Sequence, residues 1–148
     1  MSELLRVEHL KKYFHTPDGE LHAVDDVSFT LNKGETLGVV GESGCGKSTL
    51  GRTILGLTEA TDGKIFFEEQ DITTASGRRR KELRRDMQII FQDPFSSLNP
   101  RYCVKELIAD PLETYHVYRR KEDLDKRVAE LMDIVGLAKR LTYAYPHE

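Results

Sequence analysis

The chain has 148 residues, of which 39% are hydrophobic and 32% charged, and its formal net charge at pH 7 is -3. This composition is typical of a globular protein and excludes collagen-like and disordered chains. The acidic balance provides no overall attraction to nucleic acid, and no apolar run of about 18 residues predicts a membrane span. We therefore expect neither a nucleic-acid partner nor a direct membrane span.

The first forty residues predict β-structure. Apolar residues suggest a strand over residues 4–10, and alternation over residues 27–31 suggests a half-buried strand. The sequence Pro-Asp-Gly at residues 17–19 predicts a turn between them. Residues 36–40 are apolar on both faces, which predicts a central parallel strand.

The rest of the chain predicts helices and two further strands. A helix is expected over residues 47–57, and strands over residues 64–67 and 87–91. The clearest helix covers residues 121–135 and stops at Gly136. Its apolar stripe consists of Leu124, Val128, Leu131 and Val135.

Between the predicted central strand and the first helix lies a glycine-rich loop. Residues 41–48 read G-E-S-G-C-G-K-S, which fits the pattern G-x-x-x-x-G-K-[ST]. Its glycines allow consecutive N–H groups to turn inward around phosphate oxygens, and the helix adds its positive dipole end. A turn that only joins strand to helix is the simpler alternative, but the flanking strand and helix favour a phosphate site.

The glycine loop, defined here as residues 41–46, and the three residues after it predict a binding site for ATP and Mg²⁺. Lys47 would reach the outer two phosphates, Ser48 would offer its hydroxyl to Mg²⁺, and Thr49 would contact the inner phosphate. The predicted nucleotide-binding residues are Gly41, Glu42, Ser43, Gly44, Cys45, Gly46, Lys47, Ser48 and Thr49. A disulfide at Cys45 would distort the loop, so we expect Cys45 and Cys103 to be reduced thiols.

The glycine-rich loop, residues 91–94 (Phe-Gln-Asp-Pro) and the lead-in residues 31–35 together resemble the ATP-binding subunits of ABC transporters. More narrowly, three separated segments resemble the subgroup that powers dipeptide and oligopeptide importers. They are residues 40–49, residues 91–101 and residues 145–148, Tyr-Pro-His-Glu. The resemblance implies an α/β P-loop NTPase fold with an N-terminal antiparallel β portion and an incomplete core sheet. It places the P-loop core in residues 1–92 and a partial helical subdomain in residues 93–148.

The resemblance also implies roles for residues outside the loop. An aromatic ring after the first strand stacks on adenine in this family, which makes Phe14 the best match and Tyr13 the second choice. Core packing is the alternative for Phe14. Gln92 matches the glutamine that reaches Mg²⁺ or the attacking water, so Lys47 and Gln92 are the implied catalytic residues and Ser48 and Gln92 the implied metal ligands.

Residues needed for hydrolysis are missing from the 148 residues. P-loop enzymes hold Mg²⁺ with a carboxylate at the end of a second core strand, and only residues 87–93 offer an apolar run ending in an acid. That run fits the glutamine loop better. The family's signature motif, Walker B strand and switch histidine are also absent. We therefore expect a truncated chain that binds ATP but does not hydrolyse it alone.

The resemblance further implies partners and a location. They are transmembrane permease subunits, a second ATP-binding subunit, and a cytoplasmic position on the inner face of the membrane. Two alternatives stay open: a small P-loop kinase, and a non-catalytic fragment that docks on a permease. The basic run at residues 78–85 invites a nucleic-acid interpretation, but a solvated helical face is favoured.

Overall fold

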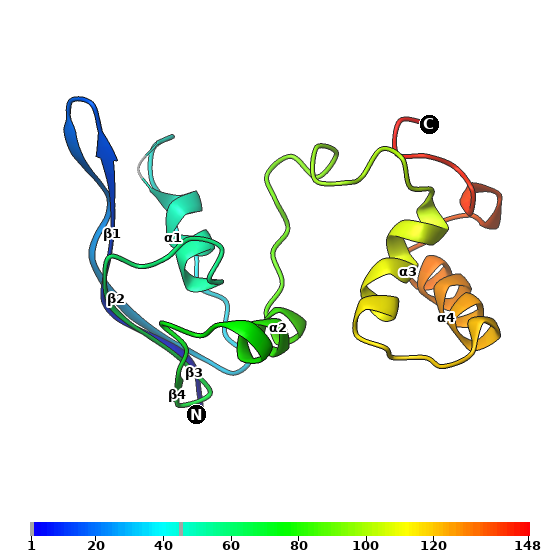
Figure 1. Cartoon of the computed structure of the whole chain (residues 1–148), viewed down its shortest axis with the longest axis horizontal. Helices are drawn as coiled ribbons and strands as arrows, with labels where there is room; N and C mark the ends of the chain where they lie inside the picture. Colours follow the sequence, from blue (N-terminus) through cyan, green and yellow to red (C-terminus); the bar gives the residue numbers. More distant parts are fainter. Residues whose placement is uncertain (1, 45) are drawn as a thin grey trace. The chain divides into compact units, whose positions relative to one another are not determined.

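The computed structural model describes residues 2–44 and 46–148, which form two compact units, Met1–Gln88 and Ile89–Glu148 (Figure 1). The first unit combines an antiparallel sheet with two helices, and the second unit is helical. The predicted α/β class, with its N-terminal antiparallel β portion, is therefore confirmed. The division predicted after residue 92 stays a prediction.

A long β-hairpin forms most of the sheet. β1 (Glu3–Thr16) pairs antiparallel with β2 (Gly19–Asn32), so both strands predicted here are confirmed and are longer than expected. The other edge of β1 pairs antiparallel with β3 (Asp62–Phe67), which also confirms a predicted strand. The short β4 (Gln70–Asp71) completes the order β2-β1-β3-β4.

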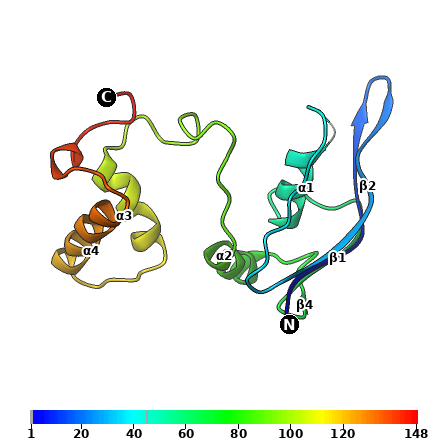
Figure 2. The same cartoon turned by 180° about the vertical axis from the view of Figure 1, so that it is seen from behind.

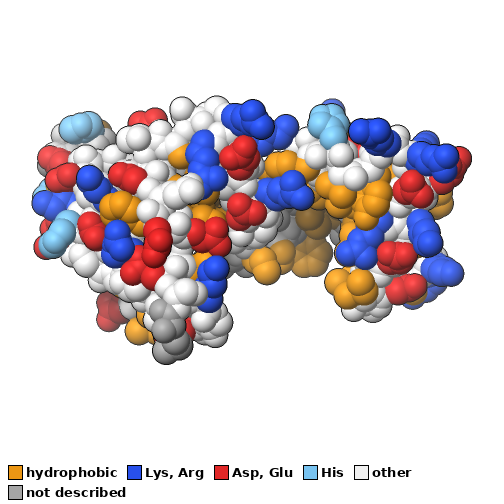
Figure 3. All heavy atoms as spheres, turned by 90° about the horizontal axis from the view of Figure 1, so that it is seen from below, with side chains coloured by type: hydrophobic (Ala, Val, Ile, Leu, Met, Phe, Trp, Pro, Cys, Tyr) orange, Lys and Arg blue, Asp and Glu red, His pale blue; other side chains and the backbone are white. Residues whose placement is uncertain are grey.

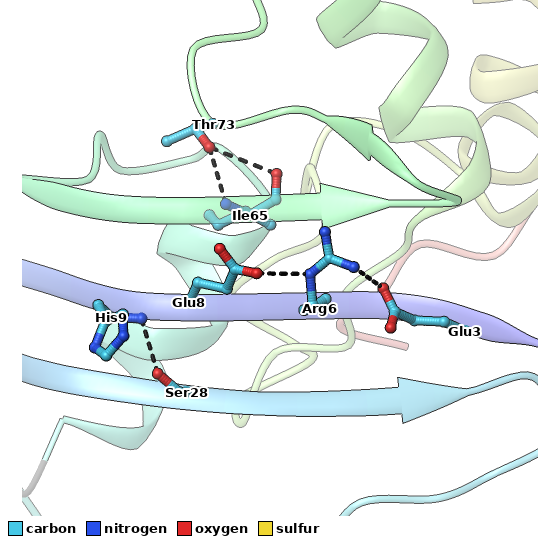
Figure 4. A network of polar contacts seen from close by, with 7 residues as sticks. All are labelled: Glu3, Arg6, Glu8, His9, Ser28, Ile65 and Thr73. Atoms are coloured by element: carbon cyan, nitrogen blue, oxygen red, sulfur yellow. Dashed lines mark hydrogen bonds and ion pairs between the residues drawn. The ribbon is translucent and has the colours of Figure 1, made fainter.

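Polar contacts accompany an irregularity in the pairing of β1. The backbone of His9 is left-handed, with φ 48°, and the register with β2 shifts between Val7 and Leu10. The N–H of His9 donates to Ser28 Oγ at 2.8 Å (Figure 4). The His9 N–H therefore keeps a hydrogen-bond partner at this bulge, because the Ser28 hydroxyl takes the place of a carbonyl of the neighbouring strand.

The core of the first unit lies between the sheet and its two helices. α1 (Lys47–Ile54) contributes Leu50 and α2 (Gly77–Asp86) contributes Leu83, and both helices cover the same face of the sheet (Figures 1 and 2). The cluster consists of Val7, Leu10, Val24, Leu50, Ile65, Phe67, Ile72 and Leu83. This packing holds the start of α1, where the glycine loop ends, against β2.

Two strand predictions are wrong. Residues 36–40 and 87–91, all of them described, form no strand, and Val40 and Ile90 are 92% and 91% exposed. A central parallel strand needs a hydrogen-bonding neighbour on each side, and the described sheet is antiparallel throughout. Most of the apolar side chains therefore stay exposed, namely Leu37, Val39, Val40, Ile90 and Phe91. Figure 3 shows hydrophobic side chains among charged ones on one face of the molecule.

α1 ends earlier than the predicted residue 57. Gly56 has φ 71°, and the N–H of Leu57 donates back to the carbonyl of Arg52 at 2.9 Å. The N–H of Gly56 donates to the carbonyl of Thr53 at 3.1 Å. These two bonds form a Schellman motif, in which the left-handed glycine closes the helix.

The second unit packs α3 (Val104–Thr114) against α4 (Lys121–Ile134), followed by a 3₁₀ turn, Lys139–Leu141. Its buried cluster consists of Ala109, Leu124, Val128 and Met132. The predicted stop at Gly136 is confirmed by its left-handed φ of 76°. The predicted apolar stripe is partly wrong, because α4 ends before Val135, which is 67% exposed, and Met132 fills the core instead.

The last residues of the chain complete the start of α3. The N–H of Val104 donates to the carbonyl of Ala144, and the N–H of Lys105 donates to that of Thr142, each at 2.9 Å. The N–H of Cys103 donates to Glu106 Oε2 at 2.8 Å, which forms one half of a capping box. First-turn amides that would lack partners are thereby satisfied, and the C-terminal segment is fixed to the helical unit.

Candidate functional site

The glycine loop takes its shape from two left-handed glycines. Gly44 and Gly46 have φ of 82° and 98°, a conformation that glycine adopts readily. Gly46 is the N-cap of α1, and its carbonyl accepts the first helical bond from Leu50 N at 2.9 Å. Cys45, which the sequence places in the predicted site, lies outside the described residues.

Gly46 packs directly on the hairpin. A Cβ built on Gly46 would lie 2.0 Å from the carbonyl oxygen of Ala23, which is shorter than any non-bonded contact allows. Any side chain here would push the loop away from β2. The close contact fixes the end of the glycine loop against the hairpin, and sequence patterns did not reveal Ala23, because a small apolar residue in a strand has no distinctive signal.

The start of α1 is suited to an anion. Gly46 has no side chain to cap the helix, and the first turn of α1 contains no acidic residue. The amides of this turn and the positive end of the helix dipole therefore have no negative side chain beside them in the turn. Ser48 is exposed and Thr49 is half-buried, so both are positioned in the turn that an anion would approach.

Lys47 bends back over the glycine loop. Its Nζ donates to the carbonyl oxygens of Gly41 at 2.6 Å and Glu42 at 2.8 Å. A positive charge is thus held at the mouth of the loop by backbone oxygens. The ammonium group carries three rotatable donors on a flexible stem, so it is a type of donor that can also bind phosphate oxygens.

Two neighbouring aromatic residues near the end of β1 have different surroundings. Tyr13 stacks on His22 with ring centroids 3.7 Å apart and 10° between the planes, and its N–H donates to Thr61 Oγ1 at 2.9 Å. Phe14 is 38% exposed, and Lys12 Nζ lies 4.9 Å from the centre of its ring. Tyr13 is therefore occupied by contacts within the chain, whereas Phe14 presents part of its ring to solvent.

The hydroxyl of Tyr13 donates to the carboxylate of Asp25. This hydrogen bond is the main reason that the pKa of Tyr13 rises to about 12 from its usual value of 10.0. The same bond, helped by the nearby His22 and Lys11, lowers the pKa of Asp25. The hydrogen bond needs a protonated Tyr13 and an ionised Asp25, so each group stabilises the other in that state.

Gln92 belongs to the helical unit and is exposed. Next to it, Asp93 Oδ1 accepts the N–H groups of Phe95 at 3.1 Å and Ser96 at 3.4 Å. This Asx turn shapes the chain just after the glutamine. The structure thus brings the loop residues and the hairpin together in one unit, while the predicted role of Gln92 stays a prediction.

The residues available to a metal ion are few. Within residues 2–44 and 46–148, no three His, Cys, Asp or Glu side chains are grouped so that they could hold one. Ser48 contributes one hydroxyl at the start of α1. Mg²⁺ keeps several waters and takes few protein oxygens together with substrate phosphates, so Ser48 is the side chain here that could join such a shell.

In the part of the chain that the structure describes, none of the helices has both the length and the apolar character needed to cross a bilayer.

We predict that Tyr13 loses its proton only near pH 12, because its pKa is raised from the usual value of 10.0. Because its pKa is raised to about 12, its proton stabilises the fold fully below pH 10, and this contribution is lost between about pH 10 and 12. Ultraviolet absorbance of tyrosinate should show one late step that Tyr13→Phe removes and Asp25→Asn moves to lower pH. A late step that persists in Tyr13→Phe would contradict the assignment.

Comparisons with known proteins point to one family. A family model described as ABC transporter matches residues 24–147. The oligopeptide transport ATP-binding protein OppF of Bacillus subtilis (strain 168) is 50% identical over 147 residues, 99% of this chain and 48% of its own length. OppF of Salmonella typhimurium (strain LT2) is 50% identical over 138 residues, 93% of this chain and 41% of its own length. The chain therefore spans about half the length of these relatives.

A solved structure agrees with the fold. The ATP-binding cassette MJ0796, in a dimeric post-hydrolysis state bound to ADP and Pi, matches with a TM-score of 0.84 at 24% identity. The match covers 97% of this chain and 62% of that chain. The predicted fold class, that of an ATP-binding cassette, is confirmed by this likeness.

Proposed function

The chain belongs to the ABC transporter family, and on this premise we propose that it binds ATP as the N-terminal half of the energy-coupling subunit of an oligopeptide importer. The observation that carries the proposal is the glycine loop. Its last glycine packs on Ala23, it continues directly into the positive end of α1, and it holds the Lys47 ammonium at its mouth. This arrangement presents backbone amides and one cation to a triphosphate.

The glycine loop and the first turn of α1 have separate roles in binding the phosphates. Backbone N–H groups of residues 41–46 and of the first turn of α1 surround phosphate oxygens. Lys47 exchanges its two carbonyl partners for oxygens of the outer phosphates. The Ser48 hydroxyl would hold Mg²⁺, which would supply positive charge beside the phosphates, and Thr49 would contact the inner phosphate. Gln92 would offer an amide oxygen to Mg²⁺ or to water in the assembled subunit.

Phe14 is the proposed platform for adenine. It pairs with Leu21 on β2, two residues before the Ala23 carbonyl that contacts the glycine loop. Because Tyr13 is already stacked on His22, Phe14 is the aromatic ring of this pair that is left to receive a base. Lys12, which lies over the ring, has to move aside or contribute its charge to the bound nucleotide.

We further propose that this chain binds ATP without turning it over. Residues 2–44 and 46–148 contain no second core strand ending in a carboxylate that could hold Mg²⁺ beside the glycine loop. The relatives that it matches are about twice as long.

The proposed partners follow from the names of the relatives. OppF is described as an oligopeptide transport ATP-binding protein, and MJ0796 as dimeric. We propose a second ATP-binding subunit and transmembrane permease subunits as partners, with the chain on the cytoplasmic face of the membrane. Cargo selection would belong to the other subunits.

Magnesium ATP is predicted to raise the melting temperature of the chain by several degrees. A ligand that binds only the native state at a hundred times its Kd adds about 2.7 kcal/mol of stability. Lys47→Ala should remove most of the shift, whereas Lys33→Ala, a matched change at an exposed lysine paired with Glu68, should retain it. Differential scanning fluorimetry measures both, and an unchanged shift in Lys47→Ala would contradict the proposed site.

Stacking of adenine on Phe14 is tested separately from phosphate binding. Phe14→Ala should reduce the melting shift caused by magnesium ATP but leave the weaker shift caused by magnesium triphosphate unchanged, because only the nucleotide carries a base to stack. Tyr13→Phe retains the ring and should leave both shifts as they are. Equal losses for ATP and triphosphate in Phe14→Ala would assign the ring to core packing instead.

The absence of turnover is tested by phosphate release. The purified chain, incubated with magnesium ATP at concentrations that give the full melting shift, should release no phosphate above the level of Lys47→Ala. Steady release that Lys47→Ala abolishes would show that the chain supplies a complete hydrolytic site, alone or as a dimer.

A further inference from the structure

The ring of Phe14 is covered by the ammonium group of Lys12. Lys12 Nζ lies 4.9 Å from the centre of the ring, within the range of about 6 Å over which a cation is attracted to an aromatic face. The two residues are two positions apart on β1, and alternate residues of a strand share a face. A base that approaches this face of the ring therefore meets the ammonium group first.

The core of the first unit does not use the Phe14 ring. Among the described residues, neither the buried cluster nor the half-buried side chains packed against it include Phe14. The ring is 38% exposed, and its partner across the hairpin, Leu21, is 55% exposed. A large apolar ring outside the core, with a cation over it, can receive a ligand once the cation moves.

Arg6 shows a cation that is fixed over a ring. Its guanidinium carbon lies 4.2 Å from the centre of the Phe66 ring. Ion pairs with Glu3 at 2.7 Å and with Glu8 at 2.8 Å hold the guanidinium in this position (Figure 4). Removal of Arg6 from its ring would therefore break two ion pairs as well as the ring contact.

Lys12 lacks an anchor of this kind. None of the ion pairs formed within residues 2–44 and 46–148 includes Lys12. Lys105, which lies 5.9 Å from the centre of the Tyr143 ring, is held by Asp125 at 3.0 Å. Of these three cations, Lys12 is the one that can leave its ring at the cost of the ring contact alone.

We propose that Lys12 is a displaceable cover on the proposed adenine platform. Its ammonium group occupies the Phe14 ring in the nucleotide-free chain and leaves when the base stacks there. The stem of a lysine is flexible and its head is strongly hydrated, so water solvates the displaced group. Because a covered ring is not competent to bind a base, Lys12 lowers the affinity for ATP. The inference rests on the proposed function, which assigns the base to Phe14.

An ionic contact with the nucleotide is the alternative role for Lys12. Such a contact attracts phosphates, so its loss would weaken the binding of ATP and of inorganic triphosphate alike. A cover on the ring acts only on a ligand that carries a base. The preference for ATP over triphosphate, expressed as the ratio of the two dissociation constants, therefore separates the two roles.

The test compares this preference between variants of the 148-residue chain, with dissociation constants taken from melting shifts over a range of ligand concentrations. Lys12→Thr, a short residue that suits a strand, should raise the preference about two- to fivefold. Lys12→Arg should not raise it, since a guanidinium also stacks on aromatic faces. The matched control, Lys11→Thr, removes the same charge at the next residue, which pairs with Asp62 on β3, and should leave the preference unchanged.

An unchanged or lower preference in Lys12→Thr, or an equal gain in Lys11→Thr, would overturn the inference. A gain in Lys12→Arg would do so as well, because that variant keeps a cation over the ring. The absence of any melting shift with either ligand would overturn the proposed function and this inference with it. A normal triphosphate shift with an unchanged preference in Lys12→Thr overturns the inference alone.

Nuclear magnetic resonance follows the cover directly. In the nucleotide-free chain, the ring current of Phe14 should shift the terminal methylene protons of Lys12 upfield, and Phe14→Leu should abolish this shift. Saturating magnesium ATP should remove it as well, whereas magnesium triphosphate should retain it. Lys12 protons that keep the upfield shift in the ATP-saturated chain would show that the base does not displace the lysine.

Discussion

The contact between Gly46 and the Ala23 carbonyl is the constraint on which the candidate site depends. The segment that leads into the glycine loop, residues 36–40, forms no strand, so no sheet holds the loop from that side. Its position comes from the other end, where Gly46 packs on β2 and Leu50 enters the core. A φ of 98° and a Cβ distance of 2.0 Å together allow glycine alone at this position.

That contact makes the hairpin part of the site. Ala23 and Leu21 lie on the same strand, and Leu21 pairs with Phe14, so the loop and the aromatic ring share one rigid support. Successive residues of a strand face opposite sides. The polar cluster that binds Tyr13 to His22 and Asp25 therefore secures one face of the hairpin and leaves Phe14 to the other.

The sequence predicted features that local chemistry determines. The glycine loop was recognised because its backbone conformation depends on residues within a few positions, and Gly136 ended α4 for the same reason. Residues 36–40 and 87–91 were predicted as strands because their apolar pattern is right, but a strand exists only where a neighbour pairs with it. Ala23 could not be identified, since only the folded hairpin brings it to the loop.

The same distinction separates the proposed phosphate site from the groups that turnover needs. The proposed site uses backbone amides, a helix end and one lysine, all within residues 41–49, plus a hairpin that precedes them in sequence. Its position depends on the hairpin and on the core into which Leu50 packs. Positioning a metal-bound water needs a carboxylate on a further core strand, which is a long-range feature. The residues proposed for binding therefore lie close together in the sequence, whereas turnover depends on a carboxylate that only a distant strand would supply.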